Sequence, residues 1–166
     1  MKAKIASYAI LVLFIAILQT TLFDYIKIFN VKPNILLVFT VSFAIMNGNV
    51  NGAVAGFFSG MVFDLMTGSI LGLNTLLSMY TGLVCGNVNK RFYRDNIVVV
   101  MIMTFISTFL YSTIFYILTR SAGPVKINIL HAIRHVVIPE SIYNSFMSIF
   151  MYIIVIKLNH ALNTVE

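Results

Sequence analysis

The chain has 166 residues, of which 60% are hydrophobic and only 10% are charged, and its formal net charge is +6. Soluble domains have about 45–50% apolar and about 25% charged residues, so this composition excludes an ordinary soluble globular domain. A chain this apolar is not intrinsically disordered either. The composition indicates an all-α polytopic membrane protein, with no stretch left for a soluble catalytic domain.

The positions of the basic residues and the number of cysteines bear on nucleic-acid binding and on disulfide formation. The 11 lysines and arginines are scattered beside apolar runs and form no patch, which argues against nucleic-acid binding. Cys85 is the one cysteine, so an intrachain disulfide is excluded.

The apolar runs, taken in chain order, predict six transmembrane helices. The first run follows Lys2 and Lys4, an opening that a signal peptide shares, but the run is long for a signal peptide and no small-residue cleavage site follows it. Pro33 opens the second run, and we expect it at the first helical position, where its missing N–H costs no hydrogen bond. The expected spans are residues 5–23, 33–47, 52–67, 72–88, 97–119 and 142–158, within one transmembrane domain over residues 1–166.

The second, third and fourth runs are short for spans of about 20 residues. They gain length from their uncharged flanks, or one of them is re-entrant. Strands are not expected, since the runs lack the alternation of a barrel wall. Basic residues divide almost evenly between the two sides, but the cluster of Lys90, Arg91 and Arg94 favours a cytoplasmic N-terminus. An even number of spans then places the C-terminus in the cytoplasm as well.

Residues 127–138 predict an amphipathic helix that lies along the membrane surface, with Asn128, His131, Arg134 and His135 on one face. The spacing of His131 and His135 suits a pair of metal ligands. A zinc-protease motif would need Glu where Ala132 stands, and a metal site would need a third ligand. We therefore expect a solvated interfacial face, without a metal or another cofactor.

Small residues recur every four positions along the third and fourth runs. They are Gly52, Gly56 and Gly60 in the third run, with Gly48 just before it at the same spacing, and Ser78, Gly82 and Gly86 in the fourth. Such stripes let two helix backbones approach closely in a membrane. One interpretation is a tight hairpin within the chain, and the other is a docking surface for a partner's helix.

Asp64 is an acid within the third apolar run. A carboxylate inside a membrane suggests a functional site, but a proton or cation relay would need further acids or histidines within the spans. Asp64 is therefore predicted to have a structural role, either capping backbone groups of the turn at residues 68–74 or pairing with a lysine or arginine. Ser59 lies between two glycines, but the expected spans offer it no base, so a serine protease is not predicted.

Taken together, these motifs resemble the MreD family of bacterial rod shape-determining membrane proteins, over nearly the whole chain. None of the matching residues forms a catalytic signature. The residues that carry the resemblance, besides the glycines at 48–60, are Pro33, Asn34, Asp64, Gly68, Gly72, Asn74, Pro139 and Asn144.

The resemblance implies a non-enzymatic scaffold of the cell-wall elongation machinery, embedded in the lipids of the bacterial plasma membrane. It implies association with MreC, and through MreC with MreB, RodA and a class B penicillin-binding protein. At the level of the fold, the pattern also resembles the substrate-binding subunits of energy-coupling-factor vitamin transporters. The alternative function is therefore a small-molecule binder, with Asn34, Asn74, Asn87 and Asp64 as its polar groups.

Overall fold

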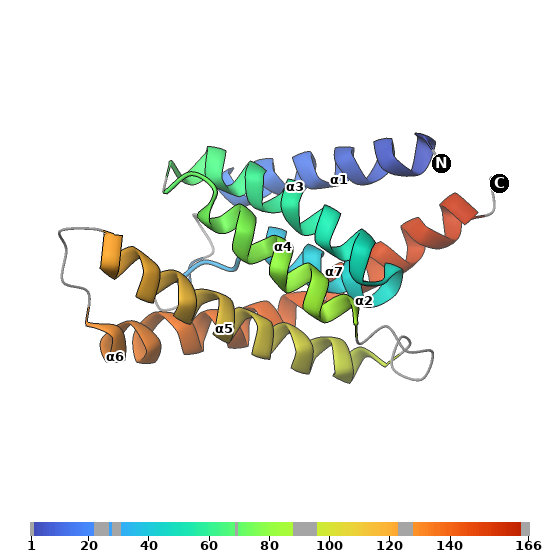
Figure 1. Cartoon of the computed structure of the whole chain (residues 1–166). Coiled ribbons are helices and arrows are strands. Elements are labelled where there is room, and N and C mark those ends of the chain that lie inside the picture. The colour runs from blue at the N-terminus through green and yellow to red at the C-terminus, as the bar shows by residue number, and fades with distance from the viewer. Residues whose placement is uncertain are drawn as a thin grey trace.

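The computed structural model describes residues 2–21, 27, 31–68, 70–87, 96–122 and 128–163, and these fold into helices (Figure 1). The elements are α1 (Lys2–Thr21), α2 (Ile35–Asn47), α3 (Asn49–Thr67), α4 (Leu73–Gly86), α5 (Ile97–Ala122), α6 (Ile129–Ala132), the π-helical turn η1 (Ile133–Val137) and α7 (Ile138–Asn163). The predicted all-α class is confirmed.

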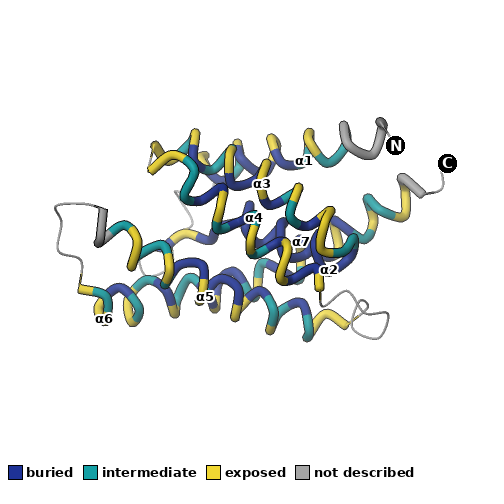
Figure 2. Tube along the Cα trace, in the orientation of Figure 1, coloured by how far each residue is buried: buried dark blue, intermediate teal, exposed yellow. Residues whose placement is uncertain are grey.

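Helix α2 lies at the centre of the bundle, and every residue from Ile35 to Met46 is buried. Figure 2 shows this helix almost wholly in the buried class, whereas the helices around it alternate between buried and exposed positions. Asn34 caps α2, since its side chain accepts a hydrogen bond from the Leu37 N–H at 3.1 Å. Pro33 therefore precedes the cap, and its expected placement at the first helical position is wrong by two residues.

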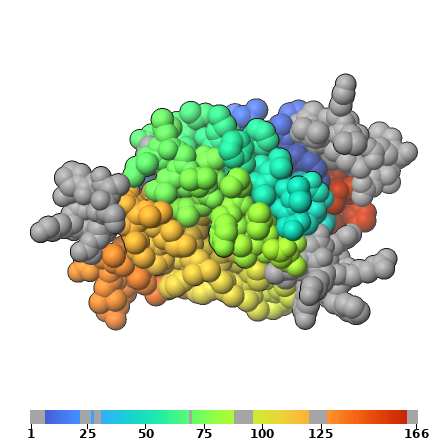
Figure 3. Space-filling view, in the orientation of Figure 1, coloured from blue at the N-terminus to red at the C-terminus, as the bar shows by residue number. Residues whose placement is uncertain are grey.

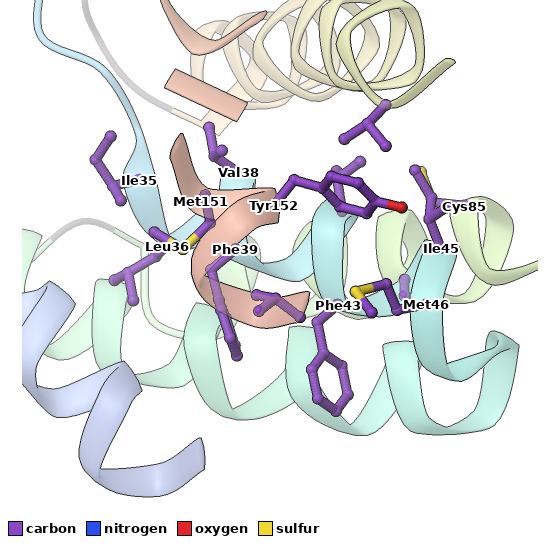
Figure 4. Close-up of a cluster of buried hydrophobic side chains, with 14 of the residues drawn as sticks. Ile35, Leu36, Val38, Phe39, Phe43, Ile45, Met46, Cys85, Met151 and Tyr152 are labelled. Atoms are coloured by element: carbon purple, nitrogen blue, oxygen red, sulfur yellow. The ribbon is translucent and has the colours of Figure 1, made fainter. Parts of the chain in front are cut away.

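The main hydrophobic cluster joins α2 to α7, α1, α4 and α5. Figure 4 shows Tyr152 of α7 extending across α2 toward Cys85 of α4, beside Ile45. Tyr152, Phe39 and Cys85 are each about 1% exposed. Buried side chains of α4 and α7 thus meet those of α2 and hold it in place.

The distribution of polarity is the reverse of that in a soluble protein. Large apolar side chains are exposed along the outer helices, including Leu13, Phe58, Leu65, Phe146 and Phe150. Small polar side chains, largely serine, threonine and asparagine, are buried between the helices. This arrangement suits a lipid environment, where apolar groups face the surroundings and polar groups must find partners inside.

Three helical stretches of the described residues are long and apolar enough to cross a membrane: Asn49–Thr67, Ile97–Thr119 and Ile129–Ala161. Two shorter apolar helices, Ser7–Thr21 and Ile35–Asn47, accompany them. The number of spans therefore stays a prediction, but successive helices run in alternating directions (Figure 1). Helix α1 begins and α7 ends at the same end of the molecule. The opposite end carries the start of α2, the turn between α3 and α4, and α6, and is called the turn end below.

The segment at residues 127–138 differs from the separate surface helix that we expected. Elements α6, η1 and α7 follow one another without a break, so residues 129–138 are the first part of the last long helix, and residue 127 lies outside the described residues. Within the π turn, the Ile138 N–H bonds to the carbonyl of Ile133. The wider turn accommodates Pro139, which has no N–H and would clash with the preceding turn of a regular α-helix.

Candidate functional site

The glycine stripe of α3 lies directly against the backbone of α4. A Cβ atom on Gly56 would lie 2.2 Å from the carbonyl oxygen of Ser78, and one on Gly60 would lie 2.6 Å from that of Asn74. Contacts this short leave no room for any side chain. Figure 3 shows α3, α4 and α5 side by side on one continuous face of the molecule.

The small-residue stripe of α4 packs against the glycine stripe of α3. A Cβ atom on Gly82 would lie 2.1 Å from the carbonyl oxygen of Gly52, and one on Gly86 would lie 2.3 Å from the Cα atom of Asn49. Gly48 stands at the break between α2 and α3, with φ of 88°. The two stripes therefore cover each other, and a partner's helix could reach them only by displacing α4.

Asp64 binds the start of α4. Its Oδ2 atom accepts hydrogen bonds from the N–H groups of Gly72 and Thr75, each at 3.0 Å, and from the Thr75 hydroxyl at 2.6 Å. Its Oδ1 atom accepts from the N–H of Asn74 at 3.2 Å and from its side-chain amide at 2.9 Å. A helix start leaves several N–H groups without partners, and one carboxylate here supplies the acceptors. In the structure, Asp64 thus takes the capping role, the first of its two predicted alternatives.

The turn between the two helices has the backbone conformations that this cap requires. Gly68 ends α3 with φ of 59° and Gly72 precedes α4 with φ of 92°, both in the left-handed region that favours glycine. The turn thereby brings Gly72 and Thr75 within reach of Asp64, so three motif residues of the sequence serve one local structure.

A second buried connection joins motif residues that lie far apart in the sequence. The Oδ1 atom of Asn144 on α7 accepts a hydrogen bond from the Asn34 N–H at 2.9 Å. The Asn144 side-chain amide donates to the Thr108 hydroxyl of α5 at 3.2 Å. Asn144 is fully buried, and it ties the start of the central helix to α5 and α7.

A cavity of about 240 Å³ lies between these two connections, toward the turn end of the bundle. Tyr111 lines the cavity, and its hydroxyl donates a hydrogen bond to the Asn74 side-chain oxygen at 2.6 Å. The Glu140 carboxylate accepts a hydrogen bond from the Ser112 hydroxyl at 2.9 Å. The cavity is lined by Asn34, Phe63, Thr67, Asn74, Tyr111, Ser112, Phe115, Tyr116 and Glu140.

A comparison with protein families matches residues 2–162 to the family described as rod shape-determining protein MreD. The chain belongs to the MreD family. The resemblance inferred from its motifs is confirmed, and with it the assignment to shape-determining membrane proteins. Searches among curated proteins and among solved structures gave no match.

Other candidate residues of this MreD-family chain lie apart from the cavity. The rings of His131 and His135 are 4.3 Å apart between centroids, but the described residues contain no group of three or more metal-ligating side chains. The Ser59 hydroxyl is buried and makes no hydrogen bond with the described part of the chain. Asn87 bonds to Asn49 at 3.1 Å, at the opposite end of α4 from the cavity.

Sequence reasoning missed Glu140 and Tyr111. Glu140 lies outside the six expected spans, whereas the structure places it in the first turn of α7. A signal was present, because Glu140 precedes the motif residue Asn144 by four positions and therefore shares its helix face. Tyr111 carried no such signal, since the chain has 8 tyrosines and 14 phenylalanines, most of them in apolar runs.

Proposed function

We propose that this MreD-family protein is a non-enzymatic scaffold of the cell-wall elongation machinery in the bacterial plasma membrane. It associates with MreC, and through MreC with MreB, RodA and a class B penicillin-binding protein. The family match over residues 2–162 is the observation that carries the proposal, because it covers the whole bundle and not one segment of it.

The buried polar contacts support a scaffold. Asp64 fixes α3 against α4, and Asn144 fixes α2 against α5 and α7. The hydrogen bonds of both side chains hold helices in one arrangement. A fixed arrangement of helices is what a protein needs to present a constant surface to its partners.

We propose further that both termini are cytoplasmic and that the chain crosses the membrane six times. The shared position of the start of α1 and the end of α7 is compatible with an even number of crossings (Figure 1). In this orientation the turn end, with the cavity, faces the outside of the membrane.

The partner surface is best sought among outward-facing side chains. Leucine at Gly56 or Gly60 would drive α3 from α4, so loss of MreC after that change would report misfolding. Tryptophan substitutions at exposed positions avoid this problem. Two exposed positions are chosen on the outer face of each of three helices. They are Ile10 and Ile17 on α1, Val54 and Leu65 on α3, and Phe146 and Phe150 on α7.

The test combines cell shape with co-purification in the rod-shaped bacterium to which the protein belongs. Depletion should convert rods to rounded cells, and the tagged wild-type protein should retain MreC after detergent extraction. Tryptophan on one helix face should abolish MreC retention, while equally abundant variants of the other faces retain it. Unchanged cell width after depletion, together with no MreC on the wild-type protein, would refute the scaffold.

The alternative, a vitamin-binding transport subunit, is less well supported by the cavity. Pockets for drug-sized molecules measure roughly 300–1,000 Å³, and the cavity measures about 240 Å³. Mass spectrometry of the purified protein tests this alternative directly, because a stoichiometric vitamin would replace the scaffold proposal.

A further inference from the structure

Two carboxylates inside the described bundle, the buried Asp64 and the half-buried Glu140, differ in how their oxygens are occupied. Asp64 accepts hydrogen bonds from Gly72, Asn74 and Thr75, which account for the acceptor sites of a carboxylate. Glu140 accepts one hydrogen bond from the described residues, from the Ser112 hydroxyl. An ionised carboxylate away from water is costly unless it is paired. Glu140 therefore has acceptor capacity left for a cationic donor.

Glu140 lines the cavity just after an irregular, π-helical turn of the backbone. It follows the π turn Ile133–Val137 and Pro139, and π turns inside helices occur frequently at functional sites. The π turn shifts the register of all later residues on the helix. Glu140 thereby faces Ser112 of α5 and not the exterior.

The rest of the lining suits a cation. Phe63, Tyr111, Phe115 and Tyr116 contribute aromatic rings, whose faces attract ammonium groups. The described lining includes no lysine, arginine or histidine that would neutralise Glu140 internally.

A metal ion fits this lining poorly. Ca²⁺ takes about 6–8 oxygen ligands, but the amide oxygens beside the cavity are engaged. The Asn74 oxygen accepts from Tyr111, and the Asn34 oxygen accepts from the N–H of Leu37. An ammonium group needs only a few acceptors and gains from the aromatic walls.

We propose that this cavity binds a protonated primary amine, with Glu140 as its counter-ion. The volume of about 240 Å³ admits a small group and not a drug-sized molecule. Exposed Thr67 belongs to the lining, so the cavity is reached from the turn end. The ammonium has two sources, a soluble amine or the headgroup of phosphatidylethanolamine. The inference is independent of the scaffold function.

The test uses the full chain and the protection of Cys85 as its readout of folding. Cys85 is the one cysteine and is 1% exposed, so its labelling by a maleimide on heating reports opening of the bundle. Ethylammonium chloride should raise the temperature of half-labelling in detergent, and sodium chloride at equal concentration should not. In nanodiscs, replacing part of the phosphatidylcholine by phosphatidylethanolamine tests the lipid source.

Two variants test the assignment of Glu140. Glu140→Gln keeps an acceptor for Ser112 but removes the charge. It should weaken ethylammonium binding about 10- to 100-fold, the equivalent of a hydrogen bond to a charged group. Thr67→Lys, at an exposed lining position, supplies an internal ammonium and should block the site in a folded protein. Asn51→Ala is the control, because Asn51 is exposed near the start of α3, at the other end of this helix from Thr67, and the variant should keep binding.

The outcomes separate the two sources and can overturn the proposal. A shift with ethylammonium alone identifies a soluble amine, whereas a shift with phosphatidylethanolamine that ethylammonium does not increase identifies the headgroup. If wild type responds to neither probe, the cavity holds only water. An equal ethylammonium response in wild type and in Thr67→Lys or folded Glu140→Gln also overturns the proposal.

Discussion

Asp64 offers the sharpest test of what holds α3 and α4 together. The substitution Asp64→Asn keeps one side-chain oxygen and replaces the other by an NH2 group. With Oδ2 replaced, the N–H groups of Gly72 and Thr75 lose their acceptor and face a donor instead. The remaining oxygen still accepts from Asn74, so the change is confined to one side of the carboxylate.

The expected cost follows from these two N–H groups. A buried donor left without a partner costs about 1–3 kcal/mol, which applies to the Thr75 N–H, and the half-buried Gly72 N–H adds about 1 kcal/mol. Asp64→Asn should therefore destabilise the bundle by about 2–4 kcal/mol. The control is Asn51→Ala on the same helix. Asn51 is exposed, and within the described part of the chain its side chain bonds only to the carbonyl of Asn47, at 2.9 Å. Its loss should change stability by less than about 0.5 kcal/mol.

Maleimide labelling of Cys85 measures the difference without unfolding the whole sample. Labelling requires an opening that exposes α4, so its rate follows the free energy of that opening when reclosing is fast. A cost of about 2–4 kcal/mol corresponds to labelling that is roughly 30- to 1,000-fold faster. If Asp64→Asn labels no faster than Asn51→Ala, the carboxylate does not hold the hairpin and the capping argument is wrong.

Three further outcomes are expected. Gly56→Ala should sharply lower the yield of folded protein, since its Cβ would meet backbone atoms of Ser78 at 2.2 Å. In Gly68→Ala the added Cβ meets nothing within 4 Å, so that variant should cost only about 1–2 kcal/mol of left-handed backbone strain. Size-exclusion chromatography compares the yields of the two variants. Asn144→Leu should destabilise the bundle by about 1–3 kcal/mol, because it leaves the buried Asn34 N–H without its acceptor. The measurement is faster labelling of Cys85, and labelling at the wild-type rate would contradict the role of this hydrogen bond. Cys85 itself should resist labelling in mild detergent and react fully in SDS, and rapid reaction in both would show that Cys85 is not buried.

The local features of the fold were accessible from the sequence because their causes are local. A glycine every fourth residue forms one stripe on a helix whatever surrounds it, and such stripes favour close packing in membranes. The capping of α4 by Asp64 was one of two predicted roles for the same reason. Gly68 and Gly72 stand within a few residues of Asp64, so a turn that returns to its carboxylate is readable from their spacing.

The long-range contacts were not accessible. Pro33, Asn34 and Asn144 were recognised as motif residues, but nothing in their spacing shows that Asn34 and Asn144 bond across 110 positions. The centrality of α2 was equally hidden, since an apolar run reads the same whether lipid or protein surrounds it. The boundary before the last span was misplaced because the polar face of residues 127–138 indicates a separate surface helix, whereas a π turn continues the helix from Ile129 past Pro139.

The burial of α2 has a consequence for how the protein enters a membrane. Its 13 residues make a helix of about 20 Å, shorter than the hydrocarbon core of about 30 Å. Lipid would have to thin around such a helix if it stood alone, but the neighbouring helices cover it. The longer helices α3, α5 and α7 include the stretches that are long and apolar enough to cross a membrane. We therefore expect α2 to reach its final depth together with the helices that cover it, since α7, at the end of the chain, supplies part of that cover.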